Sequence, residues 1–376
     1  MFSRWQIRVL LIGNVLFGVG IGLLMAAIPN QGRTQFFGSS GGNVNDISKS
    51  FCCSGTLGSL VKDSSGLQYI LSNNHVLADT DQAAPGQNIS QPGLVDNNCR
   101  PATTVAHFTV APHLGTNVDA ALAKLVAGTM NSSGSILGIG APNPTPVSAK
   151  INMGVAKSGR TTGLTCGSVQ SVNTSVKVQY QKGCNQGQKF TISYTNQVVV
   201  VSSTFSAGGD SGSLIVSKSA AHPTALLFAG SSTTTVGNPI GQVLSHVSSS
   251  LGKQVSFVGS SSRTTNVSCP AAAEVTSAAQ GGPSQVDIDR VDAVKQAHES
   301  DLMADPAVMA VGIGADERNS AVITVYVETG RMHGAIPAEI EGVPIRIIST
   351  DRIRAYGWNE RQNQAAANPC SAKQLH

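Results

Sequence analysis

The chain has 376 residues, which corresponds to roughly two to three domains of ordinary size. Charged residues make up only 12% of it and glycine occupies 40 positions, so long solvated helices are disfavoured and short strands joined by turns are favoured. The net charge of +4 comes from scattered Lys and Arg without interleaved aromatic residues, a pattern that argues against nucleic-acid binding.

The charge balance reverses along the chain. Residues 1–273 hold 16 Lys and Arg against 7 Asp and no Glu, whereas residues 274–376 hold 9 Lys and Arg against 14 Asp and Glu. The first block therefore carries +9 and the second −5. The sequence thus indicates two parts of different composition.

The first 29 residues predict an export segment. Arg4 and Arg8 precede an apolar run over residues 9–28 that only Asn14 interrupts. A run of about 20 residues is near the length that crosses a bilayer and exceeds the usual signal-peptide core. We expect residues 1–29 to be a signal peptide or an N-terminal membrane anchor, and the protein to be extracytoplasmic, either secreted or membrane-anchored.

Residues 30–50, rich in Gly, Ser and Asn, predict a flexible lead-in. From residue 51 to residue 258, β-favouring runs alternate with turn residues, which predicts an all-β domain built as a barrel or sandwich pair. The clearest runs are Gly55–Val61, Tyr69–Leu71, Val105–Val110, Ala120–Val126, Gly167–Tyr180, Phe190–Val201, Ser213–Val216 and Ala225–Phe228. Helical spacing follows at Ile240, Val243, Leu244 and Val247.

Residues 259–285 are small and polar and predict a linker to a small α+β module at residues 286–358. In this module Asp289 can cap a helix that Pro306 stops. The strands expected after the helix are Val308–Gly314, Ala321–Glu328, Val343–Ile348 and Ile353–Tyr356. Residues 359–376 predict a mobile tail apart from Cys370.

The cysteines indicate disulfides in an oxidising compartment. There are seven, at Cys52, Cys53, Cys99, Cys166, Cys184, Cys269 and Cys370. They include no C-x-x-C pair, which argues against zinc and thioredoxin-type sites, and no metal or other cofactor is expected. Spacing alone leaves their connectivity open.

One serine lies in a sequence suited to a nucleophile. Ser211 follows Gly209-Asp210 and precedes Gly212 and an apolar strand. Glycines let the backbone approach a substrate closely, so the N–H groups of Gly209 and Ser211 could hold an oxyanion. The competing interpretation is an ordinary glycine turn.

A base and a carboxylate are also available. His75 follows the apolar run Tyr69–Leu71, and Asp119 begins an alternating strand where it could be buried. Acyl transfer by serine needs a base that takes the hydroxyl proton and a carboxylate that orients the base. A lone histidine here would more often be structural, but together these residues make His75, Asp119 and Ser211 the candidate catalytic triad.

These segments resemble the chymotrypsin-like serine peptidases. Gly209–Gly212 is similar to the nucleophile motif of that family, and Asp119–Leu125 is similar to its aspartate motif. The resemblance runs from about Cys52 to Gly259. It implies two six-stranded antiparallel β-barrels with the triad in the cleft between them.

Two branches of the family are nearest in their motifs. The segment Lys157–Gly167 resembles the bacterial alpha-lytic protease and streptogrisin type. The segments Ser72–Ala78 and Leu227–Ser232 are similar to the narrow-leaf-type peptidases of plants and their bacterial relatives.

Departures from the family pattern affect the cysteines. His75 lacks the cysteine that commonly follows it, and Ala156 stands where the bacterial branch has the partner of Cys166. We therefore expect Cys166 to pair with Cys184. The further expected pairs are one of Cys52 and Cys53 with Cys99, and Cys269 with Cys370, with one thiol of the adjacent pair unmatched.

A second departure concerns Asp210, because no Ile-Val-Gly-Gly activation sequence is present to supply an N-terminal amine. A buried carboxylate needs a cation. The bacterial resemblance implies Lys157 as this partner, with Arg160 as the second choice. Ser213 also stands where the family usually has glycine.

The resemblance places a primary specificity pocket around five residues. Phe205 would lie at its base next to Ser206, and Ala229, Gly230 and Ser231 would form the facing wall. The base carries no carboxylate for a basic side chain, so cleavage is expected after apolar or small residues.

The sequence therefore predicts a serine endopeptidase that acts on protein or peptide substrates through an acyl-enzyme. The alternative is a catalytically inactive barrel that serves as an extracytoplasmic binding module. The C-terminal module shows no catalytic constellation. It could be an inhibitor or folding aid docked on the oppositely charged peptidase domain, a substrate-recruiting module, or a spacer.

Overall fold

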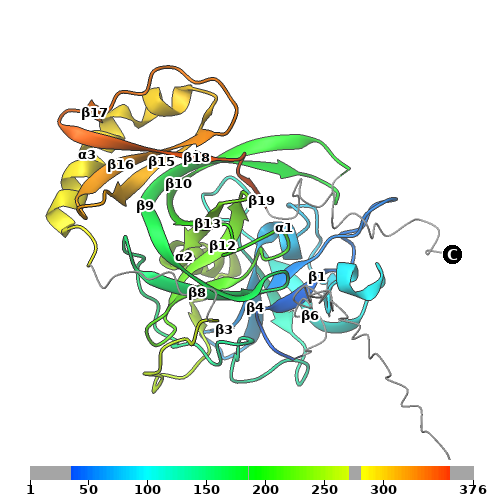
Figure 1. Ribbon diagram of the computed structural model, residues 1–376. Coiled ribbons are helices and arrows are strands. Elements are labelled where there is room, and N and C mark those ends of the chain that lie inside the picture. Colours follow the sequence, from blue (N-terminus) through cyan, green and yellow to red (C-terminus); the bar gives the residue numbers. More distant parts are fainter. Residues whose placement is uncertain (1–34, 185, 271–280, 356–376) are drawn as a thin grey trace, which may run out of the picture.

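The chain forms two β-barrels and a smaller α+β module beside the second barrel (Figure 1). The computed structural model describes residues 35–184, 186–270 and 281–355. The predicted fold class, an all-β barrel pair followed by a small α+β module, is confirmed by the strand pairing. The apolar run 9–28 and the predicted tail 359–376 lie outside the described residues.

The first barrel closes around a core of aliphatic side chains. Its strands follow the order β3-β4-β7-β6-β5-β1-β2, and only Gly58 separates β2 from β3, so the two ends of the sheet meet. Leu60, Ile70 and Leu122 are fully buried inside it. The strands are β1 (Ser39–Asn43), β2 (Gly55–Leu57), β3 (Ser59–Asp63), β4 (Gln68–Ser72), β5 (Asn88–Gln91), β6 (Thr103–Val110) and β7 (Ala121–Leu125).

The second barrel is a closed ring of six antiparallel strands in the order β8-β9-β10-β13-β12-β11, with β11 paired to β8. Two of its strands, β9 and β10, form a long hairpin that reaches beyond the barrel (Figure 1). The strands are β8 (Gly154–Gly159), β9 (Gly163–Gln181), β10 (Lys189–Val201), β11 (Leu214–Ser217), β12 (Pro223–Gly230) and β13 (Thr234–Pro239).

Helix α2 (Ile240–Leu251) follows the second barrel, as the helical spacing predicts, and buries Ile240, Val243 and Val247. The chain then returns to the first barrel, where β14 (Val255–Phe257) pairs with β3. Two short helices complete this part, α1 (Asn74–Leu77) and the 3₁₀ helix η1 (Leu94–Asn97).

The C-terminal module packs helix α3 (Gln285–Ala304) against a small sheet. Its strands are β15 (Val308–Ala315), β16 (Ala321–Glu328), β17 (Glu339–Ile340), β18 (Val343–Thr350) and β19 (Arg354–Ala355). Strand β15 pairs with β9, so the sheet of the module continues that of the second barrel. The helix begins before the predicted Asp289, because the Ser284 hydroxyl accepts the N–H of Asp287 and caps it.

The predicted flexible lead-in at residues 30–50 contains a barrel strand, so that prediction is wrong for β1, whose five residues are all buried. Its small side chains are required by tight packing rather than by flexibility. A Cβ on Gly41 would lie 2.4 Å from the Leu57 side chain, closer than atoms can approach. Composition alone cannot distinguish this cause from flexibility.

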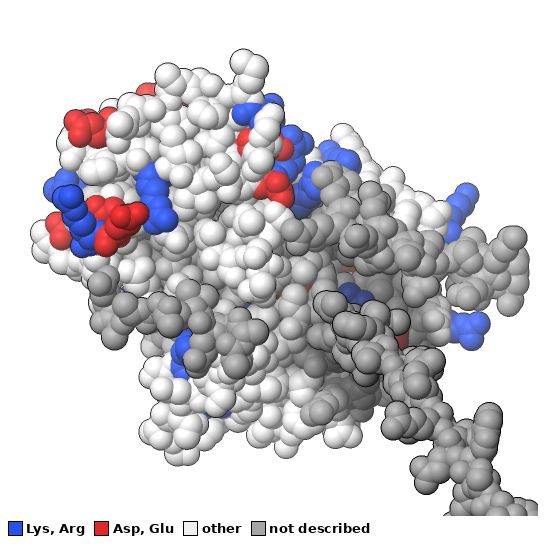
Figure 2. All heavy atoms as spheres, viewed as in Figure 1, with Lys and Arg blue, Asp and Glu red and all other residues white. Residues whose placement is uncertain are grey.

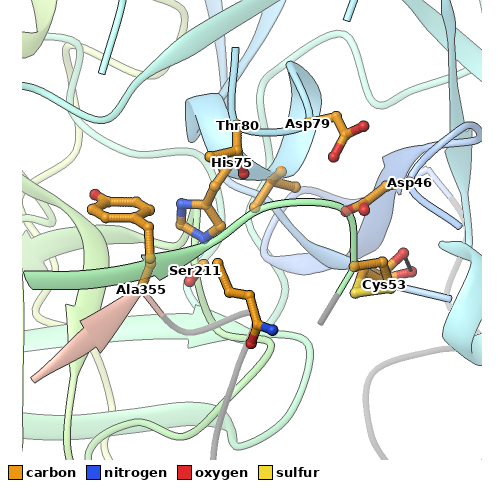
Figure 3. A pocket seen from close by; sticks show the side chains of 12 residues that line it. Asp46, Cys53, His75, Asp79, Thr80, Ser211 and Ala355 are labelled. Atoms are coloured by element: carbon orange, nitrogen blue, oxygen red, sulfur yellow. Dashed lines mark hydrogen bonds between the residues drawn. A yellow bond between two sulfur atoms is a disulfide. The ribbon is translucent and has the colours of Figure 1, made fainter. Parts of the chain in front are cut away.

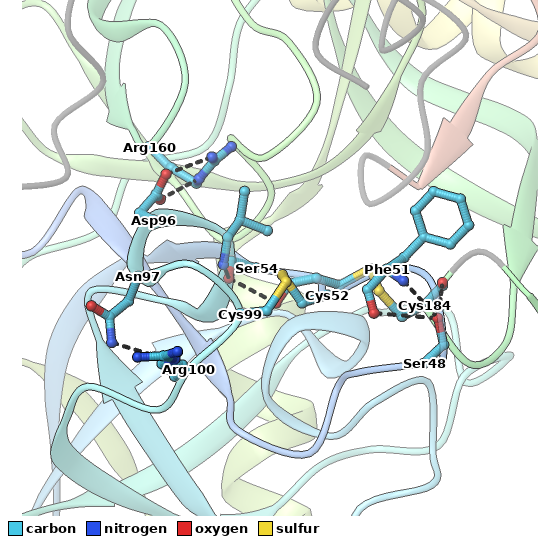
Figure 4. Close-up of a disulfide and its surroundings, with 12 residues drawn as sticks. Ser48, Phe51, Cys52, Ser54, Asp96, Asn97, Cys99, Arg100, Arg160 and Cys184 are labelled. Carbon is cyan, nitrogen blue, oxygen red and sulfur yellow. Dashed lines mark hydrogen bonds and ion pairs between the residues drawn. A yellow bond between two sulfur atoms is a disulfide. The ribbon is translucent and has the colours of Figure 1, made fainter. Parts of the chain in front are cut away.

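Two of the predicted disulfides are wrong and one is confirmed. Cys52 pairs with Cys99 as expected (Figure 4). Cys53 instead pairs with Cys184, and Cys166 pairs with Cys269. No described cysteine is left unpaired.

Topology explains both errors. The tip of the β9–β10 hairpin carries Cys184 across to the first barrel, where it meets Cys53. The segment after β14 returns along the second barrel, with the N–H of Val267 bonded to the Lys218 carbonyl, and brings Cys269 to Cys166. This part of the predicted linker 259–285 is thus fastened to the barrel.

Within the described ranges, no helix has the length and apolar character needed to cross a membrane. Charged side chains gather on the C-terminal module in the view of Figure 2 and are sparse over the barrels.

Candidate active site

His75 lies at the end of the first barrel that faces the second. Strand β4 ends at Ser72, and Asn73, in an extended conformation, leads into α1. This single helical turn contains His75, which is buried. The backbone N–H of His75 donates to Asp119 Oδ1 at 3.3 Å, and the imidazole Nδ1 lies 2.6 Å from Asp119 Oδ2. This bond fixes the orientation of the ring and directs Nε2 into the cleft.

Asp119 precedes β7 and is fully buried. Its backbone N–H donates to the Asn238 side chain of the second barrel at 2.8 Å, and its carbonyl accepts a bond from Asn73 Nδ2 at 2.6 Å. Both barrels therefore hold this aspartate in place. A carboxylate fixed behind an imidazole is what a general base needs to keep one tautomer.

Ser211 comes from the glycine-containing loop before β11, in the second barrel, and lies beside His75 in the same pocket (Figure 3). Neither Ser211 Oγ nor His75 Nε2 has a hydrogen-bond partner among the described residues, although both atoms are buried. Because an unpaired buried polar atom is costly, two such atoms side by side are unusual outside functional sites. The structure thus brings the three candidate triad residues together.

The loop that carries Ser211 needs its glycines. Gly209 has φ of +93°, and a Cβ there would lie 2.5 Å from Thr161 Oγ1. Gly212 has φ of +92°, and its Cβ would lie 2.2 Å from the carbonyl oxygen of Thr56 in the first barrel. Within the described residues, the N–H groups of Gly209 and Ser211 donate no hydrogen bond, so both are available as the predicted oxyanion donors.

The carboxylate of Asp210 stabilises the loop that carries Ser211. It accepts the backbone N–H groups of Thr161, at 2.8 Å, and of Ala207, at 3.0 Å, and Lys157 Nζ lies 3.3 Å away. Both partners of this ion pair are fully buried, and burial lowers the pKa of Lys157, which the nearby Asp210 charge opposes. Arg160, the second choice, instead pairs with Asp96 at 2.5 and 2.7 Å (Figure 4).

Tyr180 contacts the triad, although no sequence motif singles it out. Its hydroxyl donates to Asp119 Oδ2 at 2.9 Å and lies 2.7 Å from the Tyr194 hydroxyl. Burial, followed by the Asp119 charge, raises the pKa of Tyr180 well above its usual value, so the phenol stays a donor. This contact depends on the pairing of the long strands β9 and β10, and no local sequence motif predicts it.

A pair of carboxyl groups lines the pocket on the side of the Cys53–Cys184 disulfide (Figure 3). Burial raises the pKa of Asp46 well above its usual value, and the neighbouring Asp79 adds to the effect. Burial also raises the pKa of Asp79 to about 6. Asp46 lies close to both sulfurs, but these are bonded to each other and are not available to ligate a metal as thiolates.

The five residues predicted to form the specificity pocket lie in two different environments. Phe205 is fully buried among Val169, Val200 and other aliphatic side chains of the second barrel, and Ser206 bonds to Thr235. Neither residue lines the pocket that contains His75 and Ser211. Ala229 and Gly230 lie on β12, where they pair with Ala355 and Arg354 of β19, and Ser231 bonds to Thr350 at 2.8 Å.

Comparisons with known proteins gave no match to a family profile or to a curated protein. Among solved structures, a glutamic-acid-specific serine protease is 20% identical with a TM-score of 0.43, over 59% of this chain and 99% of that one. A Nocardiopsis protease is 18% identical with a TM-score of 0.39, over 59% and 98%. A Cellulomonas bogoriensis chymotrypsin is 16% identical with a TM-score of 0.40, over 60% and 99%.

The chain is therefore similar to bacterial chymotrypsin-like serine proteases at low sequence identity. At these values the similarity adds nothing about the chemistry of the site. The chemistry of the site depends on the positions of His75, Asp119 and Ser211.

Proposed function

We propose that the protein is a serine endopeptidase that uses His75, Asp119 and Ser211. The observation that supports this most strongly is the bond of 2.6 Å from His75 Nδ1 to a fully buried Asp119, with His75 Nε2 and Ser211 Oγ unpaired in one pocket. An inactive binding barrel has no need for this arrangement.

The proposed reaction is acyl transfer. Ser211 Oγ attacks the scissile carbonyl while His75 Nε2 takes its proton, and the N–H groups of Gly209 and Ser211 bind the oxyanion. His75 then gives the proton to the leaving amine, and the acyl-enzyme forms. Water then attacks the ester carbonyl while His75 takes its proton. His75 returns a proton to Ser211 Oγ as the acid product leaves. Asp119 stays ionised and stabilises the imidazolium.

We further propose cleavage after apolar or small residues. Phe205 is buried in the core of the second barrel, so its position offers no carboxylate to a basic substrate side chain, and Ala229, Gly230 and Ser231 are small. A leucyl or alanyl anilide should therefore be hydrolysed faster than an arginyl anilide. Faster hydrolysis of the arginyl compound would contradict this specificity.

An extracytoplasmic location is part of the proposal. The three disulfides among the described residues indicate an oxidising compartment, and an export segment at residues 1–29 would deliver the protein there. We also propose that the C-terminal module docks on the peptidase domain. The antiparallel pairing of β15 with β9 supports this, because main-chain bonds then join the two parts.

The test of the proposed function is peptide hydrolysis by the full chain and its triad variants. Ser211→Ala, His75→Ala and Asp119→Ala should each lose most of kcat, leaving a residual rate of roughly 10³ to 10⁴ over the uncatalysed reaction. Ser132→Ala, at an exposed serine, is the matched control and should behave as wild type. Equal hydrolysis of a single-residue leucyl ester by wild type and Ser211→Ala would refute the assignment.

A further inference from the structure

Strand β12 has an edge next to Ser211 that no strand of the barrels covers. Strand β11 pairs with β12 only at Pro223, Ala225 and Leu226, while β13 pairs with its other side as far as Gly230. The main chain of Ala229 and Gly230 on the first side is instead paired with β19, from the far end of the described chain. This edge borders the pocket that contains His75 and Ser211, because Ala355 also lines that pocket (Figure 3).

The segment that covers this edge is anchored on several sides. Ile353 is fully buried next to Tyr180, Tyr194 and Phe228, and its carbonyl accepts the N–H of Gln179 at 3.0 Å. The Thr350 hydroxyl lies 2.8 Å from that of Ser231 and 3.0 Å from that of Thr234. Ser232 bonds to Asp351. The residues from 350 to 355 thus occupy a defined site between β9 and β12.

A protein or peptide substrate of a peptidase binds most readily in an extended conformation, as an added strand on a sheet edge. An added strand needs main-chain donors and acceptors that are not already paired. Those of Ala229 and Gly230, the nearest edge to the nucleophile, are taken by Ala355 and Arg354. A substrate strand and β19 therefore compete for the same residues.

We propose that the segment Thr350–Ala355 is an intramolecular occupant of the substrate-binding edge and keeps the peptidase latent. The proposal rests on the proposed function and adds the identity of the group that blocks it, which is the chain itself. Extended peptides reach Ser211 efficiently only when β19 leaves β12. A small reagent that reacts with Ser211 without pairing to β12 is hindered less by β19 than an extended peptide is.

The test compares two substrates in full-length variants. Ile353→Asp places a charge in the aromatic cluster and should release β19, because a buried unpaired carboxylate is strongly disfavoured. It should raise kcat/KM for an internally quenched hexapeptide by about tenfold or more, as expected when a blocked state is the dominant one. Hydrolysis of a single-residue leucyl ester should rise much less.

Two further variants make the result decisive. Ile347→Asp adds the same charge to β18 at a half-exposed position and should leave both rates unchanged. Arg354→Pro weakens the pairing without a buried charge and should also raise hexapeptide hydrolysis, which decides the matter if Ile353→Asp does not fold. Folding is followed by circular dichroism.

Labelling of Ser211 by a fluorophosphonate separates the two possible failures. If the released variants are labelled yet cleave the hexapeptide no faster than wild type, latency by β19 is wrong and the peptidase assignment stands. If neither wild type nor any released variant is labelled or cleaves peptides, the proposed function fails, and the latency proposal with it.

Discussion

Tyr180 extends the candidate triad by one hydrogen bond. Its hydroxyl and His75 Nδ1 share the same oxygen of Asp119, at 2.9 and 2.6 Å. A donor fixed in this place stabilises the charged carboxylate and limits its rotation, so that the imidazole keeps its orientation. We regard Tyr180 as a positioning residue, since it acts through Asp119.

Tyr180→Phe should lower kcat for peptide hydrolysis about ten- to hundredfold with little change in KM, because a bond to a charged group contributes roughly 1.5–3 kcal/mol. Tyr194→Phe is the matched control. Tyr194 reaches Asp119 only through Tyr180, so its loss should be smaller. A change in KM alone, or a larger effect of Tyr194→Phe, would show that the two tyrosines only fill space.

The Lys157–Asp210 pair supports the loop that forms the oxyanion donors. Lys157→Met should leave a buried carboxylate without a cation, which costs about 3–5 kcal/mol and disorders the Ser211 loop. Arg160→Met breaks a different pair, with Asp96, and should leave most of the activity. The measurement is kcat/KM together with the free energy of unfolding, and the opposite order of the two variants would contradict the assignment.

The long β9–β10 hairpin is the element that joins distant parts of the protein. Its base belongs to the second barrel and its middle pairs with β15. Tyr180 lies near its tip, and Cys184 in the tip is bonded to Cys53 of the first barrel. The sequence predicts both strands from their β-favouring runs. Local spacing cannot show how far the tip reaches, and for that reason the expected Cys166–Cys184 pair is wrong.

The disulfide at the hairpin tip should contribute to stability. Replacing Cys53 and Cys184 together by alanine should lower the free energy of unfolding by about 2–4 kcal/mol, because the bond joins residues 131 apart and limits the unfolded chain. The matched control, replacement of Cys52 and Cys99, removes a link over 47 residues and should cost less. Urea unfolding at one pH measures both, and an equal or reversed order would contradict this account.

Strands made of small or charged residues were harder to predict than strands made of aliphatic and aromatic ones. Strands such as β6 and β10 follow from runs of Val, Thr and Phe, whereas β1 and β8 consist largely of Gly, Ser and other small or charged residues. In β8, Lys157 is buried because Asp210 lies opposite, which is a tertiary cause that no strand propensity records. The candidate triad was predictable because three separate motifs each carry one of its residues.

At the scale of the whole molecule, the C-terminal module and the second barrel form one continuous sheet through β15 and β9. The change in charge along the sequence indicates a module of different composition. Figure 2 shows charged side chains of both signs gathered on this module. The sequence predicts a strand at Ile353–Tyr356, where β19 lies, but neither composition nor spacing predicts that this strand returns to β12. This return depends on the distance between the end of β18 and the barrel edge, which only the fold determines.

The central claim is that Ser211 is an activated nucleophile, and covalent labelling by a fluorophosphonate tests it most directly. With wild type and Ile353→Asp, mass spectrometry should place the label on the peptide that contains Ser211. Labelling should be absent in Ser211→Ala and strongly reduced in His75→Ala. No label on either active form, or equal labelling of Ser211→Ala, would contradict the account.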